Sequence, residues 1–335
     1  MADANIKLKI FNFPFLNVIQ IMKKTVLFIL VFLVLCIGAV YIFIPKKMGV
    51  SSALSFRANG DGLFRCLAQE SNWKKWWPGT VTKTNSDSLR FTHHSYNFEV
   101  RELLYSAIKL KLFRSGDSSD ALLRIIRVST DSIRVELLSQ LEAEADPFSR
   151  LVTYWRGKRI ETTFNDILSS LNEYASEVKN IYGIDIRNEK VQFQNLVSTT
   201  QSFAHYPTTD EVYAMIARLR NYINQAGAKE LFSPMLNIKK TDGTNYTAQV
   251  GLPVDRVLPD KDDISSKWMM KGGNILTGEV KGGKKEIEGA QKQMELYIID
   301  YQRSIIAIPF QMLITDRTKE PDSTKWITRI YYPVV

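Results

Sequence analysis

The hydrophobic pattern begins with one long apolar run near the start of the chain. Residues 25–44 read TVLFILVFLVLCIGAVYIFI and contain no charged side chain. As a helix, these twenty residues would span roughly 30 Å, the thickness of the hydrocarbon core of a bilayer. A cleaved signal peptide has a shorter apolar region of about 7 to 15 residues. The pattern therefore predicts a transmembrane helix over 25–44, after a tail over 1–24.

Basic residues on both sides of this run indicate how the predicted helix is oriented across the membrane. They are Lys7, Lys9, Lys23 and Lys24 before the run, and Lys46, Lys47 and Arg57 after it. The small excess before the run favours an N-terminus in the cytoplasm. We therefore expect a single-pass protein of the inner membrane, with its folded part outside the cytoplasm. Cleavage near the small residues 51–53 is the alternative to a permanent anchor.

Residues 48–138 alternate between apolar and polar positions in short runs, which is typical of antiparallel strands. The runs are 51–57, 88–91, 97–103, 107–113, 121–128 and 132–138. Further along, apolar residues recur at helical spacing from Ile160 to Ile181, which predicts one long helix with a single apolar stripe. The pattern therefore predicts a curved antiparallel sheet crossed by a long helix.

A tryptophan-rich turn follows the short helix that we expect over 62–69. Trp73, Trp76 and Trp77 precede a Pro-Gly dipeptide, and such an apolar load is expected to cover a core or the mouth of a cavity. With the long helix, these features resemble the START-like helix-grip superfamily, or SRPBCC, which includes polyketide cyclases. The resemblance implies a domain over 48–185 whose cavity holds a lipid or hydrophobic small molecule beside these tryptophans. A cavity filled by its own side chains is the alternative.

The last part of the chain contains one pattern twice, offset by 75 positions. The matched pairs are Glu211 and Glu286, Val212 and Ile287, Leu219 and Met294, Tyr222 and Tyr297, Ile223 and Ile298, and Pro234 and Pro309. Each copy, about 190–256 and 270–335, predicts a βαββ unit with one amphipathic helix. Two such copies bury their open faces against each other, so we expect a concave pocket at their junction.

Three segments of this region resemble the GyrI-like family, the effector-binding domain of AraC-type regulators. They are 309–316, 320–322 and 326–334. The resemblance implies a pseudo-twofold sheet over 186–335, with two helices on one face and a small-molecule pocket on the other. The family commonly has acids where Gln311 and Arg329 stand, and an aromatic residue at Leu313. These departures remove negative charge that a lipophilic cation would need, and with it the acid that assists hydrolysis in some members.

Five side chains are candidates for contact with a ligand in this pocket. Strand alternation places Gln311 and Leu313 on one face, where the Gln311 amide can hydrogen-bond a neutral ligand. Tyr297 and Tyr331 are aromatic candidates, with a place in the core as the alternative. Glu279 is the remaining acid near a Gly-Gly turn, with a surface strand position as its alternative.

Composition and charge narrow the classes of function. The formal net charge of +9 comes from 44 basic and 35 acidic residues, but the basic residues are scattered in short pairs rather than gathered on one face. Nucleic-acid binding is therefore not expected. The chain has two cysteines, one of them in the apolar run, and three histidines. His93 and His94 lie in an expected strand, so we expect their side chains on opposite faces and no zinc site.

Together these patterns predict an α+β protein with an N-terminal transmembrane helix, a helix-grip antiparallel sheet domain and a duplicated βαββ-type effector-binding domain. The function predicted is a bacterial, membrane-anchored protein that senses or sequesters a hydrophobic small molecule or lipid. No DNA-binding region, cofactor or metal is expected, and the sequence specifies no protein partner. The alternatives are a hydrolase or cyclase acting on small hydrophobic compounds in one of the two pockets, and a purely structural module.

Overall fold

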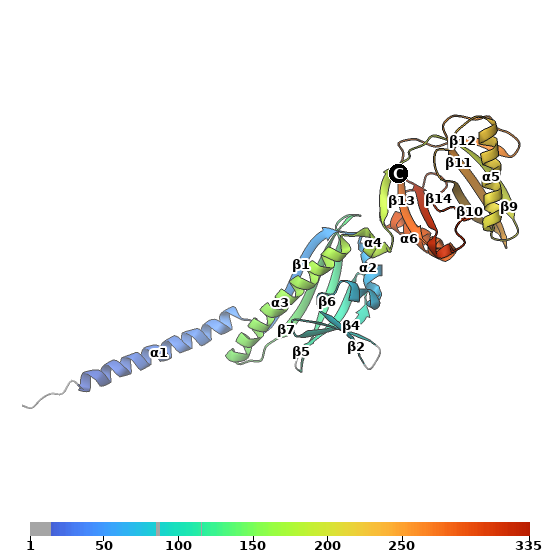
Figure 1. Ribbon diagram of the computed structural model, residues 1–335. Helices are drawn as coiled ribbons and strands as arrows, with labels where there is room; N and C mark the ends of the chain where they lie inside the picture. Colours follow the sequence, from blue (N-terminus) through green and yellow to red (C-terminus); the bar gives the residue numbers. More distant parts are fainter. Residues whose placement is uncertain (1–14, 85–87, 115) are drawn as a thin grey trace, which may run out of the picture.

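The computed structural model describes residues 15–84, 88–114 and 116–335. It begins with one long helix, α1 (Phe15–Phe43), drawn in blue in Figure 1. Residues Ile21–Phe43 have a mean hydropathy of 3.1 over their most apolar part, and almost all of them are exposed. This helix is therefore long and apolar enough to cross a membrane. Tyr41 ties its end to the folded part, since its hydroxyl donates to the Ala145 carbonyl at 2.8 Å.

The chain then forms a seven-stranded antiparallel sheet in the order β1-β7-β6-β5-β4-β3-β2. The strands are β1 (Lys47–Arg57), β2 (Thr80–Lys83), β3 (Leu89–His93), β4 (Tyr96–Leu103), β5 (Ala107–Arg114), β6 (Asp117–Arg127) and β7 (Ser132–Glu142). Its helices are α2 (Gly60–Ala68), the 3-10 helix η1 (Glu70–Lys75), α3 (Pro147–Ala175) and α4 (Val178–Tyr182). We call these elements the first unit.

Helix α3 lies across this sheet, and its first residues carry the signals of a helix start. Asp146 caps it by accepting a hydrogen bond from the Ser149 amide, and Pro147 occupies the first turn, where its missing N–H costs nothing. The expectation of one helix up to residue 181 is wrong. The chain bends after Ala175, and two hydrogen bonds between Tyr174 and Asn180 hold the bend before α4 begins.

An eight-stranded antiparallel sheet follows, in the order β12-β9-β11-β10-β14-β15-β13-β8. The strands are β8 (Ile186–Lys190), β9 (Asn195–Phe203), β10 (Met235–Asp242), β11 (Asn245–Val254), β12 (Ile264–Trp268), β13 (Asn274–Lys281), β14 (Phe310–Leu313) and β15 (Ile327–Pro333). Two helices of 17 residues each, α5 (Thr209–Gln225) and α6 (Lys284–Asp300), complete what we call the second unit.

The second unit is built from two βαββ runs around a central antiparallel pair. In the first run, α5 leads into β10, and in the second, α6 leads into β14. Strands β10 and β14 pair at the middle of the sheet, with Met235 opposite Met312. The strand order is therefore symmetric about this pair. The expectation of an α+β fold with two antiparallel sheets and an N-terminal apolar helix is confirmed.

The two units are joined by a buried carboxylate at the end of α6. Arg65 on α2 donates two hydrogen bonds to the Asp300 carboxylate, and the Tyr182 hydroxyl on α4 donates another at 2.6 Å. The Asn59 amide donates to the Asp300 backbone carbonyl at 2.8 Å. The Asp300 side chain is only 3% exposed. Burial, followed by the Asp300 hydrogen bond, raises the pKa of Tyr182, so this phenol stays protonated and keeps donating.

Candidate functional site

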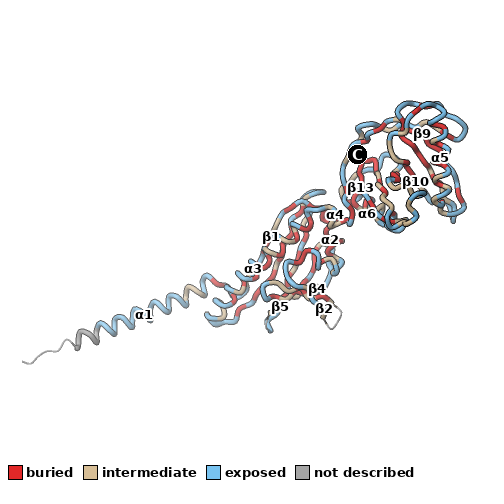
Figure 2. The backbone as a smooth tube through the Cα atoms, viewed as in Figure 1, coloured by how far each residue is buried: buried red, intermediate tan, exposed pale blue. Residues whose placement is uncertain are grey.

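Strand alternation divides the apolar residues of the second unit between two faces of its sheet. One face packs beneath α5 and α6, while the opposite face carries a separate apolar cluster. Adjacent residues that fall on opposite faces include Leu196 and Val197, Met235 and Leu236, Ile275 and Leu276, and Tyr331 and Ile330. Figure 2 shows buried residues in red along β9, β10 and β13. The second face has no helix over it among the described residues, so loops border it.

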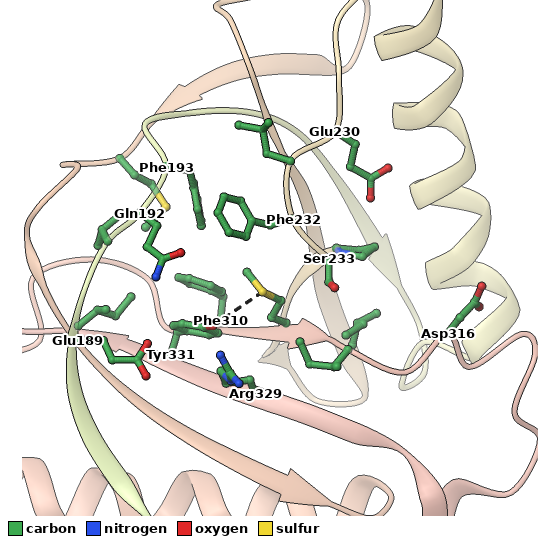
Figure 3. A pocket seen from close by; sticks show the side chains of 18 of the residues that line it. Glu189, Gln192, Phe193, Glu230, Phe232, Ser233, Phe310, Asp316, Arg329 and Tyr331 are labelled. Atoms are coloured by element: carbon green, nitrogen blue, oxygen red, sulfur yellow. Dashed lines mark hydrogen bonds between the residues drawn. The ribbon is translucent and has the colours of Figure 1, made fainter.

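A cavity of about 690 Å³ lies on this second face (Figure 3). Aromatic rings form much of its wall. Phe310 and Tyr331 stack with their ring centroids 4.8 Å apart and an interplanar angle of 8°. Phe193 and Phe232 meet at 5.3 Å with a tilt of 43°. The Tyr331 hydroxyl lies 3.8 Å from the Met312 sulfur, along the dashed line in Figure 3. A volume of this size accommodates a drug-sized molecule.

Charged side chains border the cavity in balanced numbers. The acids among its lining residues are Glu189, Glu230 and Asp316, and the bases are Lys190, Arg220 and Arg329. Arg220 holds both oxygens of the Glu230 carboxylate, at 2.8 and 2.9 Å, and this hydrogen bonding raises the pKa of Arg220. Burial raises the pKa of Tyr331, so its phenol remains a neutral hydrogen-bond donor. The site thus presents aromatic surface without an excess of either charge.

The two copies of the βαββ unit differ in one cross-strand pair that shapes this face. In the second copy Phe310 pairs with Tyr331, whereas in the first copy the corresponding Met235 pairs with Gly251. A second hollow of about 440 Å³ lies beside Gly251 and shares Phe310 with the first. A Cβ atom at Gly251 would lie 2.9 Å from the Leu196 Cδ1 atom. The tyrosine therefore gives the larger cavity an aromatic wall that the first copy lacks.

The structure separates the five side chains that the sequence proposed for this pocket. Tyr331 lines the 690 Å³ cavity, whereas Leu313 reaches the edge of this cavity from the helix side of the sheet, where it packs in the cluster beneath α5. Gln311 lies on the helix side, because it alternates with two residues that face the cavity, and there it is 6% exposed beside a hollow of about 320 Å³. Tyr297 lies on the buried side of α6 and packs against Tyr182, with 5.2 Å between ring centroids. Glu279 pairs with Arg329 at 3.2 Å.

Two aromatic residues of the cavity were not singled out from the sequence. Phe193 lies between β8 and β9, and Phe232 lies between α5 and β10. Phe193 lies in a short alternating stretch, 191–194, which predicts a strand but not what the side chain lines, and Phe232 lies in a segment with no helical or alternating pattern. The one available signal for Phe232 was its position just ahead of Pro234, which is matched by Pro309 in the other copy.

The three tryptophans of the first unit lie in its core. Trp73 is fully buried, and Trp76 and Trp77 are 3% and 6% exposed. Trp73 contacts Phe91 at 5.2 Å between ring centroids, and Trp77 contacts Phe98 at the same distance. Together with the apolar stripe of α3 they form one continuous buried cluster. This packing favours the alternative in which the space between helix and sheet is filled by the protein's own side chains.

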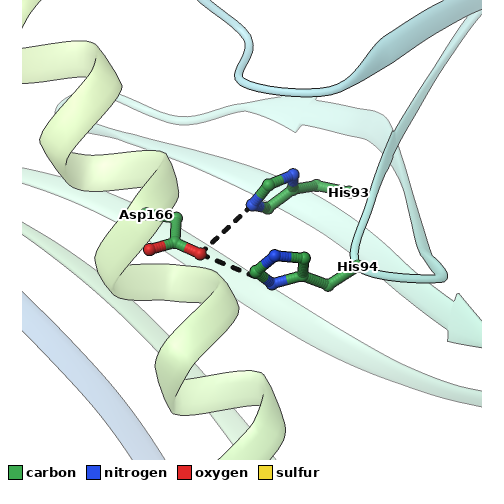
Figure 4. Close-up of side chains that lie close together, drawn as sticks. All are labelled: His93, His94 and Asp166. Atoms are coloured by element: carbon green, nitrogen blue, oxygen red, sulfur yellow. Dashed lines mark hydrogen bonds and ion pairs between the residues drawn. The ribbon is translucent and has the colours of Figure 1, made fainter.

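The expectation that His93 and His94 point to opposite faces is wrong (Figure 4). His93 ends β3, but His94 has a positive φ of 45° and belongs to the turn before β4, so strand alternation does not apply to it. The two rings stack with centroids 4.0 Å apart. Both reach the same oxygen of Asp166 on α3, at 3.3 Å from His93 and 3.4 Å from His94. Three metal-ligating side chains therefore converge.

Comparisons with known proteins find likeness in structure only. No family model matches the sequence, and no curated protein sequence matches it. The C-terminal domain of EcmrR is 15% identical with a TM-score of 0.37, covering 45% of this chain and 98% of that one. A hydrolase from Listeria innocua is 12% identical with a TM-score of 0.34, covering 45% and 91%. A START superfamily protein from Mycobacterium smegmatis is 14% identical with a TM-score of 0.29, covering 39% and 98%.

Proposed function

We propose that this protein is a membrane-anchored receptor that senses or sequesters an uncharged, aromatic small molecule in the 690 Å³ cavity of the second unit. The observation that carries the proposal is the stacked pair of Phe310 and Tyr331 in the cavity wall. With Phe193 and Phe232 nearby, a flat apolar ligand would find aromatic surface around it. Aromatic pairs contribute roughly 0.5–1.5 kcal/mol beyond the area that they bury.

The charges around the cavity favour a neutral ligand over a cationic one. A lipophilic cation needs an acid that is not already neutralised by the protein, because burying an unpaired charge is costly. Three acids and three bases line this cavity, and the Glu230 carboxylate is held by Arg220. Ser233 and Tyr331 supply uncharged hydroxyl groups that can orient a ligand carrying a single carbonyl or hydroxyl.

Helix α1 supplies the anchor in this proposal. In this proposal the apolar run over 25–44, which α1 contains up to Phe43, crosses the inner membrane, and both units lie outside the cytoplasm, as the flanking lysines favour. The two units are assigned to domains over 48–185 and 186–335. Because the tryptophans fill the first of these, ligand binding is assigned to the second alone. A receptor held at the bilayer is well placed to meet compounds that partition into lipid.

Fluorescence titration of the full chain in detergent tests this function. N-phenyl-1-naphthylamine is a neutral aromatic dye that brightens on leaving water, and tetraphenylphosphonium serves as the cationic competitor. We expect saturable dye binding that Tyr331→Ala weakens by about tenfold, equivalent to about 1.4 kcal/mol. Tyr105→Ala, which removes a ring that is 89% exposed in the first unit, provides the matched control.

The outcomes of this titration separate the possible functions. Equal dye binding by the parent chain and Tyr331→Ala would mean that this cavity is not the site. Displacement by the cation at lower concentration than by neutral naphthalene would contradict the assignment of a neutral ligand. Turnover of naphthyl acetate that is lost in Tyr331→Ala would favour the hydrolase alternative instead.

A further inference from the structure

A second site lies far from the aromatic cavity, on the first unit. His93, His94 and Asp166 come from two elements that are distant in sequence, the β3–β4 hairpin and helix α3. Figure 4 shows both imidazole rings directed at the helix and at the same carboxylate oxygen. The His93 side chain is 14% exposed, while His94 and Asp166 are 53% and 42% exposed. The cluster is therefore open to solvent on one side and enclosed on the other.

We propose that His93, His94 and Asp166 bind a divalent first-row transition ion, with Zn²⁺ as the natural occupant. Ligand atoms placed 2.0–2.1 Å from a tetrahedral zinc ion lie roughly 3.3 Å apart. The Asp166 Oδ2 atom lies 3.3 Å from His93 Nε2 and 3.4 Å from His94 Nδ1. All three donor atoms lie within 4.8 Å of one another. These separations match the edges of a tetrahedral coordination shell with a small closing movement.

The chemistry of the donors selects the kind of ion. Two imidazole nitrogens and one carboxylate suit zinc and its neighbours, whereas Mg²⁺ and Ca²⁺ prefer shells made of oxygen alone. Three protein ligands leave the fourth tetrahedral position for water or an external ligand, and the exposed side of His94 provides access to it. Such an ion would also fasten the β3–β4 hairpin to α3.

Hydrogen bonds from neighbouring side chains to the backbone fix the two elements that carry these ligands, independently of any ion. Trp77 donates its indole N–H to the carbonyl of Thr92, the residue before His93, at 3.2 Å. On the helix side, Ser170 lies one turn after Asp166 and donates to the Trp76 carbonyl. The tryptophan-rich segment thus contacts both elements that supply ligands. Ligands fixed by a supporting shell bind a metal without first having to be ordered.

The turn at His94 carries a backbone cost that a ligand role explains. His94 and Ser95 both have positive φ, 45° and 68°, in a two-residue hairpin turn where Asn-Gly is the favoured sequence. Left-handed backbone is unfavourable at a non-glycine residue. This conformation turns the His94 ring beside that of His93. An extended His94 would point to the other side of the hairpin.

Metal analysis of the full chain tests the proposal. The protein is purified in detergent with a tag that contains no histidine, stripped with a chelator, dialysed against Zn²⁺ and analysed by mass spectrometry of the metal. We expect one equivalent of zinc, with stoichiometric binding lost in His94→Ala and in Asp166→Asn. His205→Ala is the matched control, because His205 is exposed and pairs with Glu211 outside this cluster. It should bind one equivalent.

Two further readouts keep the test independent of folding defects. Co²⁺ in place of Zn²⁺ should give the visible absorption bands of a tetrahedral site in the parent chain and in His205→Ala, but not in His94→Ala. Added Zn²⁺ should raise the Tm of the parent chain and leave that of His94→Ala unchanged. Substoichiometric zinc in the parent chain, or one equivalent retained by a correctly folded His94→Ala, would overturn the proposal.

Discussion

The two units place their large aromatic residues in opposite situations. In the first unit, Trp73 and Phe98 lie between α3 and the sheet and are completely buried. In the second unit, the helices cover one face, and Phe310 and Tyr331 lie on the other, beside a cavity of about 690 Å³. The same residue types thus fill a core where a helix lies across the sheet, and line a hollow on the face that is bordered by loops and by the edge of α5. Aromatic content alone does not distinguish a core from a binding site.

The largest expected loss of stability comes from removing a tryptophan ring from the core of the first unit. Trp73→Ala deletes a fully buried side chain that contacts two other tryptophans and donates its N–H to the Leu67 carbonyl. Because the surrounding rings cannot close the space, we expect a loss of about 3–5 kcal/mol in the free energy of unfolding. Thermal unfolding of the full chain in detergent, followed by near-ultraviolet circular dichroism, measures it.

The control for this prediction is another tryptophan of the same unit. Trp155 is 61% exposed on α3, so Trp155→Ala should change stability by less than about 0.5 kcal/mol. A Trp73→Ala protein as stable as Trp155→Ala would show that the first unit has spare space, and would restore it as a second ligand cavity.

An intermediate loss in the free energy of unfolding is expected from a substitution where the two units meet. Asp300→Ala leaves Arg65 and the buried Tyr182 hydroxyl without their partner. Removing one member of a buried pair costs about 3–5 kcal/mol, but Arg65 is 41% exposed and its charge is screened, so we expect about 1–3 kcal/mol. Differential scanning calorimetry should show the unfolding transitions of the two units moving apart.

Another acidic residue, this one on α2, provides the control for Asp300→Ala. Asp61 pairs with Arg127 but is 43% exposed, so Asp61→Ala should cost no more than about 1 kcal/mol. If Asp300→Ala changes stability no more than Asp61→Ala does, the buried carboxylate does not couple the units.

The periodic parts of this structure could be predicted, because period is a local property of the sequence. Helices α5 and α6 begin at Thr209 and Lys284, 75 positions apart, and this is the offset at which matched residues recur in the sequence. The strand that contains Tyr331 lies in 326–334, one of the three segments that resemble a known family. Alternation also predicted that Gln311 and Leu313 share a face, but it could not say which face the helices would cover.

The parts that could not be predicted from the sequence depend on contacts between distant segments. Phe193 and Phe232 reach the cavity from the loops before β9 and before β10, so their meeting depends on how these distant segments pack. The sequence predicts a strand through His93 and His94, whereas the left-handed turn at His94 is seen only in the structure. Asp166 lies 73 residues further along, so its approach to them follows from the way α3 crosses the sheet. Clusters of this kind become visible only in three dimensions.

The smallest effect is expected from buried phenols at high pH. Burial raises the pKa of Tyr301 from 10.0 to about 12, and it also raises the pKa of Tyr182 and of Tyr332. A group whose pKa is higher in the folded state contributes its full stability below the unfolded pKa, and loses it as pH rises through the folded pKa. Stability should therefore fall between about pH 10 and pH 12. Since Tyr301 is partly exposed, its share is no more than about 1 kcal/mol.

Tyr301→Phe isolates this contribution, because phenylalanine keeps the ring and removes the proton. We expect the variant to match the parent chain at pH 8 and to lose less Tm between pH 8 and pH 11. Tyr105→Phe, at a position that is 89% exposed, should lose as much as the parent chain. Equal losses in all three proteins would mean that Tyr301 ionises as readily in the folded chain as in the unfolded one. Its place beside Tyr297, at 4.3 Å between ring centroids, would then be open to water, and the packing under α6 would be looser than that around Trp73.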